Sequence, residues 1–210
     1  MLYSAAMTLA GWPIVGWCTA ALSAMVAVLL ALNGAGEEGV RSVVRHTAQT
    51  SFALFIAAYS ASSLRAFWRT DGTKWLLANR RYVGVSFAVS HTLHLASLVA
   101  LYQVAESFRT SLNAGTIVGG GLAYVFLYAM AATSFDRTAA LLGQRAWKRL
   151  HTVGMHYIWL IFFLSYLPRA ILQSPAYAPF VVLLLSGLGL RIASRLRVRQ
   201  QTRVTARVAS

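Results

Sequence analysis

The chain has 210 residues, of which 58% are hydrophobic and 11% are charged, and its formal net charge is +14. A soluble domain averages roughly 25% charged and 45–50% apolar residues, so this composition excludes an ordinary soluble globular protein and a disordered one. Six membrane-crossing helices would use roughly 120 residues, which leaves too few for a nucleotide-binding domain of the usual ~100–150 residues.

Six stretches of at least 19 residues contain no Asp, Glu, Lys or Arg. Each is long enough for one membrane-crossing helix of about 17–25 residues. The sequence therefore predicts an all-α integral membrane protein built as a six-transmembrane-helix bundle. The six stretches are Met1–Gly36, His46–Leu64, Tyr82–Ala105, Thr110–Phe135, Leu150–Pro168 and Ala170–Leu190.

The positive residues are distributed unevenly between the two sides of this bundle. Fifteen of the 19 lie in Arg65–Arg81, in Arg137–Arg149 and in the tail from Arg191. Lys and Arg collect on the cytoplasmic side of membrane proteins, so both termini are predicted to be cytoplasmic. We divide the chain into a transmembrane domain, 1–194, and a basic cytoplasmic tail, 195–210. The tail suits anionic lipid headgroups better than nucleic acid, because it lacks aromatic stacking platforms.

Four of the five histidines fall on two predicted helices, His91 and His94 on the third and His151 and His156 on the fifth. Two imidazoles on facing helices are the arrangement that a bis-histidine haem b requires. The alternative is that each histidine makes a hydrogen bond between helices. A zinc site is a further option, although zinc usually has cysteine or carboxylate ligands as well. His46, near the outer end of the second helix, is interpreted as interfacial.

Depth along the helices favours one pairing of these histidines. Counted at 1.5 Å per residue from the preceding basic residues, His91 lies ~15 Å and His94 ~20 Å into the third helix. His151 lies only ~3 Å and His156 ~10 Å into the fifth. Axial ligands of one haem must lie at nearly the same height, so depth favours His91 with His156 and disfavours His94 with His151.

Three stretches resemble the ferric-reductase-like transmembrane family, and within it the haem-binding membrane subunits of periplasmic methionine sulfoxide reductase systems. The similarity covers roughly residues 40–170. The stretches are Arg80-Arg81-Tyr-Val-Gly84 leading to His91-Thr-Leu-His94-Leu, then Ala132-Thr-Ser-Phe135, and Leu142-Gly143-Gln-Arg145-Ala-Trp147-Lys-Arg149-Leu-His151.

The resemblance implies six helices, b-type haem and electron transfer across the membrane. By position, His94 matches the family's third-helix ligand, and His151 matches its first fifth-helix histidine. The family's second fifth-helix histidine would fall at Leu164 or Ser165, so that ligand is missing here. The position that pairs with His151 in two-haem relatives holds Arg80.

We expect a single haem b with an altered ligand set. Depth along the helices favours His91 with His156 as the axial pair, whereas the resemblance favours His94 and His151 as haem ligands. Both alternatives remain open.

Basic residues beside such a haem would suit its propionates, because arginine binds carboxylates bidentately. On the inner side the candidates are Arg80, Arg81, Lys148 and Arg149, and on the outer side the candidate is Arg45. The alternative reading is that they are ordinary positive-inside anchors.

The leading hypothesis is an electron-transfer subunit of the bacterial inner membrane rather than a complete enzyme. Electrons would come from quinol or a cytoplasmic flavoprotein and pass through haem to a periplasmic acceptor such as a methionine sulfoxide reductase. Quinone or flavin would then be a partner or a second cofactor. The alternative is a membrane scaffold or assembly protein of the same fold with a degenerate haem site, which the Leu164-Ser165 sequence favours. A solute transporter is disfavoured, because the predicted spans carry no Asp or Glu.

Overall fold

The computed structural model describes residues 9–208, and from residue 202 onward only the backbone. Within this range the chain is helical and contains no strand, as predicted from composition. The elements are α1 (Trp12–Asn33), α2 (Glu37–Phe67), α3 (Asp71–Ala78), α4 (Arg80–Val104), α5 (Glu106–Ser111), α6 (Ala114–Ala132), α7 (Asp136–Leu142), α8 (Gln144–Leu172), the 3-10 turn η1 (Pro175–Tyr177) and α9 (Ala178–Val208).

Five helical segments are long and apolar enough to cross a membrane, which identifies a multi-pass membrane protein. They are α1, α4, α6, α8 and the segment Pro175–Gln201 that contains most of α9. The second predicted span coincides with α2, a helix of 31 residues that is not among the five. Its role as a sixth span remains a prediction.

The polar character of α2 follows from its position in the bundle. It packs against α1, α3, α4 and α9, and 12 of its 31 residues are buried. Its buried side chains include Thr47, Ser51, Ser60 and Ser63. Small polar residues let helices approach closely and form hydrogen bonds between helices. The Oγ atoms of Ser51 and of Ser90 on α4 are 2.9 Å apart, which is one such bond.

Several helices extend past the charged residues that bounded the predicted spans. Helix α2 includes Arg41, and α8 continues through Pro168 and Arg169 to end at Leu172. Arg169 remains in the helix because it donates to the carbonyl of Ser165, one turn earlier. The boundary drawn between residues 194 and 195 lies inside the continuous helix α9. The parts of the two domain ranges that cover residues 1–8 and 209–210 lie outside the described residues.

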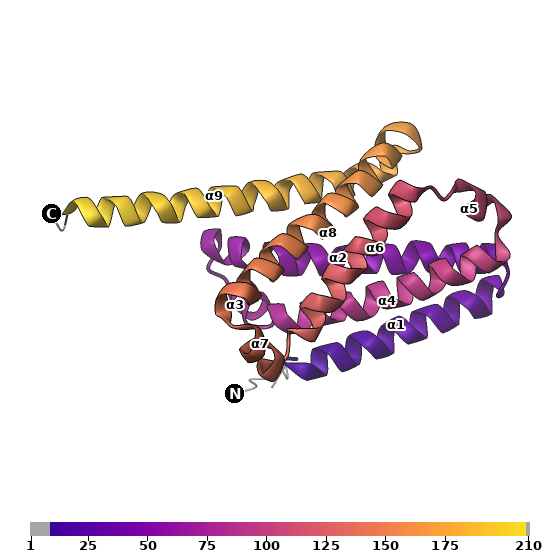
Figure 1. The fold of residues 1–210 in the computed structure, drawn as a ribbon, viewed down its shortest axis with the longest axis horizontal. Coiled ribbons are helices and arrows are strands. Elements are labelled where there is room, and N and C mark those ends of the chain that lie inside the picture. The colour runs from indigo at the N-terminus through magenta and orange to yellow at the C-terminus, as the bar shows by residue number, and fades with distance from the viewer. Residues whose placement is uncertain (1–8, 209–210) are drawn as a thin grey trace, which may run out of the picture.

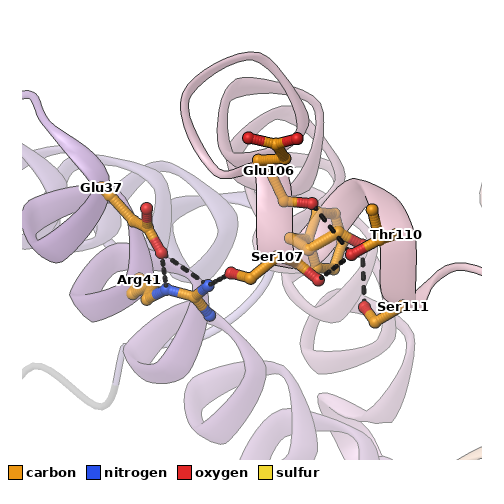
Figure 2. A network of polar contacts seen from close by, with 7 residues as sticks. Glu37, Arg41, Glu106, Ser107, Thr110 and Ser111 are labelled. Atoms are coloured by element: carbon orange, nitrogen blue, oxygen red, sulfur yellow. Dashed lines mark hydrogen bonds and ion pairs between the residues drawn. The ribbon is translucent and has the colours of Figure 1, made fainter.

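The connections gather at two opposite ends of the bundle (Figure 1). We call these the α5 end and the α3–α7 end; α9 extends well beyond the latter. At the α5 end, the turn between α1 and α2 requires two glycines. Gly34 has φ of 76°, and a Cβ on Gly39 would lie 1.8 Å from the Gly34 carbonyl oxygen. Arg41 of α2 donates hydrogen bonds to Glu37 at 2.8 Å and to Ser107 of α5 at 2.8 Å. Figure 2 shows these two contacts.

At the α3–α7 end, short helices tie the longer ones together. Asn79, between α3 and α4, accepts through its side-chain oxygen from the backbone N–H of Gly11, just before α1. Arg81 of α4 forms an ion pair with Asp136, the first residue of α7. The hydrogen bond from Arg81 holds the pKa of Asp136 below its usual range. These contacts fix the rim of the bundle where the cationic residues are concentrated.

Candidate functional site

A cavity of about 790 Å³ lies toward the α3–α7 end of the bundle. Ligand pockets typically measure about 300–1,000 Å³, so its size suits a cofactor. One wall is formed by α6 and α8, the facing wall by α2 and α4, and α9 contributes two arginines. The inner lining is apolar and includes Phe55, Phe87, Leu127, Met130 and Met155.

Five cationic side chains line this cavity, and none of the described lining residues is acidic. An apolar chamber with a cationic lining suits a ligand that has an apolar body and anionic substituents. The five are Arg80, Arg81, Lys148, Arg191 and Arg195.

Two of these guanidinium groups are incompletely paired. Arg80 donates from Nη2 to the thioether of Met155 at 3.2 Å, and a thioether is a weak acceptor. Arg191 donates to the carbonyl of Tyr59 at 2.8 Å and stacks on the Tyr59 ring, but its buried Nε has no hydrogen-bond partner. A buried charged donor without a partner is costly, so an anion in the cavity would stabilise these groups.

His151 is the one histidine among the described residues that line the cavity. Its ring stacks on Trp147, with 4.2 Å between centroids. Its Nε2 lies 3.2 Å from the hydroxyl of Thr133, which donates its own proton to the Ala129 carbonyl at 2.8 Å. Because Thr133 donates to that carbonyl, we assign it as the acceptor from His151, which places the proton on Nε2 and leaves a lone pair on Nδ1. Ligating histidines typically donate their other ring N–H in this way.

Gly84 of α4 opens the wall that faces α8. It lines the cavity, and a Cβ built on it would meet no atom within 4 Å. The cavity is thus bounded here by backbone rather than by a side chain. A flat ligand could approach the α4 backbone closely at this position.

His91 and His94 lie further along α4 than the residues that line the cavity, and they are not part of its lining. The His91 ring contacts Phe87, which lines the cavity, at a centroid distance of 5.3 Å. It also stacks on Tyr124 at 4.9 Å and on His94 at 5.3 Å. The Nδ1 of His94 lies 3.1 Å from the Thr47 hydroxyl, and that of His91 is buried without a hydrogen-bond partner. This pair is packed into the midsection of α4.

His156 lies on α8 but outside the cavity lining. Its Nδ1 donates to the Thr152 carbonyl at 2.7 Å, and its ring contacts the edge of Tyr59 at 5.7 Å. Ring contacts lead from His91 through Phe87 and Phe55 to Tyr59, each at 5.3–5.5 Å. Three aromatic rings thus stand between His91 and His156 in this chain of contacts. The structure does not bring these two imidazoles together, and their pairing as ligands stays a prediction.

The predicted propionate partners divide between the cavity and the surface. Arg80, Arg81 and Lys148 line the cavity. Arg149 and Arg45 are exposed, and neither is part of its lining. His46 is partly buried inside α2 and donates from Nδ1 to the Ser42 carbonyl at 2.8 Å, and its interfacial position stays a prediction. Within the described residues, no group of three or more His, Cys, Asp or Glu could hold a metal ion.

Sequence reasoning did not identify Thr133, Gly84, Arg191 and Arg195 as parts of a site. Thr133 and Gly84 stand inside two of the stretches that carried the family resemblance, which was the available signal. The two arginines were attributed to positive-inside anchoring, because spacing along a helix does not reveal which face meets a cavity. Only the packing of α9 against α2 and α8 shows that these two arginines face the cavity.

The fold and the site define a multi-pass α-helical membrane protein with a cationic cavity. Among curated proteins, the chain is similar to the protein-methionine-sulfoxide reductase heme-binding subunit MsrQ of Azospira oryzae. The two are 28% identical over 141 residues, which is 62% of this chain and 57% of the relative, so the chain spans somewhat more than half of that protein's length. No protein-family model matches the sequence, and no solved structure matches it.

Proposed function

We propose that this protein is a haem b-binding redox subunit of a membrane, with the haem held in the cavity that His151 lines. The single observation that carries the proposal is the cavity itself, which combines haem-like size, apolar walls, one imidazole and five cations. The similarity to MsrQ, named as a heme-binding subunit of a methionine sulfoxide reductase, supports it independently.

The residues that line the cavity fit a haem. His151 offers a ring nitrogen with a free lone pair, and Thr133 orients the ring. Gly84 leaves room on the facing wall. Arg191, with its unpaired Nε, and Arg80 are suited to carboxylates. When bound, a haem supplies a one-electron iron couple whose potential depends on its axial ligands and surroundings.

The chain's own side chains would set the conditions for electron transfer. The aromatic and aliphatic part of the lining would lower the local dielectric, and a low dielectric strengthens each charge interaction. Guanidinium groups near a redox centre favour the state with the extra electron, because they compensate its added negative charge. Arg80 and Arg191 would therefore raise the reduction potential.

The proposal also covers topology and partners. With α2 as a sixth span, both termini would be cytoplasmic, and the cavity would lie toward the cytoplasmic side of a bacterial inner membrane. Electrons would come from quinol or a cytoplasmic flavoprotein and leave to a periplasmic acceptor such as a methionine sulfoxide reductase. The charge asymmetry between the two ends of the bundle supports this orientation.

A second candidate is a membrane scaffold or assembly protein of the same fold with a degenerate haem site. The observation that favours it is the residue at the expected second ligand of the fifth helix. Leu164 is 56% exposed on the bundle surface, as expected of a lipid-facing residue. The adjacent Ser165 accepts a hydrogen bond from Arg169 through its carbonyl.

A dithionite-reduced minus oxidised spectrum of the detergent-purified protein separates the two candidates. A sharp b-type α band, with about one haem per chain by pyridine haemochrome, is expected for the redox subunit. A flat spectrum after expression with ample haem would contradict it and favour the scaffold.

A further inference from the structure

The donor atoms around the cavity are unevenly distributed between its two walls. The wall formed by α6 and α8 carries His151 and the thioethers of Met130 and Met155. The facing wall, as far as the structure describes its lining, offers Phe55, Ala58 and Gly84 with further apolar and cationic groups. Imidazole and thioether are the lining groups able to ligate haem iron, and all of them lie on one side.

The two thioethers cannot complete a pair with His151 across the haem plane. Met155 lies one turn after His151 on the same helix, so both side chains leave the same wall. Met130 is packed into the contact between α6 and α8, where its sulfur lies 2.9 Å from the position that a Cβ on Gly154 would occupy. Axial ligands must approach iron from opposite faces.

The other intramembrane histidines are separated from the cavity by aromatic rings. Phe87 lies between the cavity and His91, and Tyr59 contacts His156 from a position outside the lining. His94 lies beyond His91 in this series of contacts, because its ring stacks on His91 and its Nδ1 contacts the Thr47 hydroxyl. Reaching the cavity would require these packed side chains to be displaced.

We infer that a haem in this cavity has His151 as its only protein ligand, and that its second axial position takes a small exogenous ligand. This inference rests on the proposed haem function. Gly84 provides the space on the facing wall, since no atom lies within 4 Å of its Cβ position. Arg80 and Arg191 provide positive charge, which favours small anions such as azide.

The test uses the full-length protein loaded with haem in detergent. Carbon monoxide is added to the reduced form and azide to the oxidised form, and the Soret band is recorded. We expect both ligands to shift the band at one site per haem. Arg80→Gln should weaken azide binding about tenfold while leaving carbon monoxide binding nearly unchanged, because only azide is charged.

Two further variants distinguish an open position from a general effect on folding. In the Gly84→Leu protein that retains haem, binding of both ligands should fall at least tenfold per bound haem, because the side chain fills the open space. His156→Gln is the matched control and should behave like the wild type.

Each contrary outcome has a separate meaning. Bound haem that reacts with neither ligand would overturn the inference and leave the proposed function intact. Ligand binding that appears only after His94→Gln or His156→Gln would also overturn it, because that histidine would then be the second axial ligand. A protein that binds no haem would contradict the proposed function itself.

Discussion

The cavity and the midsection of α4 contain the same kind of residue in opposite environments. In the cavity, His151 borders a space of about 790 Å³ with five cations around it. In the midsection, His91 stacks on both His94 and Tyr124 and also contacts Phe162, so aromatic side chains occupy the space around it. A lone pair next to open space can bind a ligand, whereas a ring enclosed by other rings contributes packing and hydrogen bonds.

This comparison shows that intramembrane histidines cannot be ranked by depth or by matching positions alone. Both regions offer an imidazole whose ring is held by a threonine, Thr133 for His151 and Thr47 for His94. What differs is the volume and charge beside the ring. The cavity therefore has the properties of a binding site, and the midsection has those of a packed core.

The largest expected effect comes from removing the two histidines separately. His151→Ala should abolish haem retention, because the cavity loses its one imidazole. His94→Ala should keep most of the haem and lose stability instead. Pyridine haemochrome per chain and the Soret spectrum measure the difference. Equal haem loss in both variants would contradict the distinction between the cavity as a binding site and the midsection of α4 as a packed core.

The cationic lining can be tested against cations that lie on the surface. Arg191→Gln should weaken haem binding roughly tenfold or more, because a charge-assisted hydrogen bond contributes about 1.5–3 kcal/mol. Arg149→Gln is the control, since Arg149 is exposed and outside the lining. Haem titration of the apoprotein gives both affinities. Matching losses would mean that the net positive charge, and not the cavity, attracts the haem.

Substitutions of the two threonines that contact the histidines should have different effects. Thr133→Val should reduce haem affinity about 10–100-fold, the usual consequence of losing the group that orients a ligand. Thr47→Val should leave haem content unchanged and cost about 1–3 kcal/mol, because the buried Nδ1 of His94 loses its hydrogen-bond partner. That cost corresponds to a fall in Tm of roughly 2–12 °C. The serine variants, which keep the hydroxyl, should resemble the wild type in both assays.

The smallest effect concerns the ion pair at the rim of the cavity. Because the folded-state pKa of Asp136 is lowered by Arg81, its contribution to stability is complete above the unfolded value of about 3.9. The contribution is lost as the pH falls through the lowered folded pKa. Asp136→Asn should therefore differ slightly from the wild type in Tm at pH 7 and converge with it in acid.

Composition and charge-free stretches were sufficient to predict an all-α membrane protein and the approximate position of each long helix. Helix ends were less accurate, because arginines such as Arg41 and Arg169 find hydrogen-bond partners within or beside the helix and do not terminate it. The short helices α3, α5 and α7 were not predicted, since they lie in connections where no long apolar pattern exists.

The site was only partly accessible from sequence. His151 and Arg80, which line the cavity, were predicted together with His91 and His156, which do not, because helical spacing does not reveal whether a ring borders open space. The cavity depends on how α6 and α8 lie relative to α2 and α4, and this follows from packing across the bundle. Thr133 was overlooked because its role depends on its distance from a residue on the next long helix.

The composition of α2 has a consequence for how the protein is made. A helix is inserted by the translocon in proportion to its apolarity, and serine, threonine and histidine side chains reduce that tendency. As the proposed sixth span, α2 would depend on α1, α4 and α9 for its stability in the bilayer, because its buried serine and threonine side chains face these neighbours. It follows that α2 would be retained in the membrane securely only once α4, and finally α9, has been synthesised. Truncation before α9 should then expose a polar helix to quality-control proteases, even though every apolar span before it is intact.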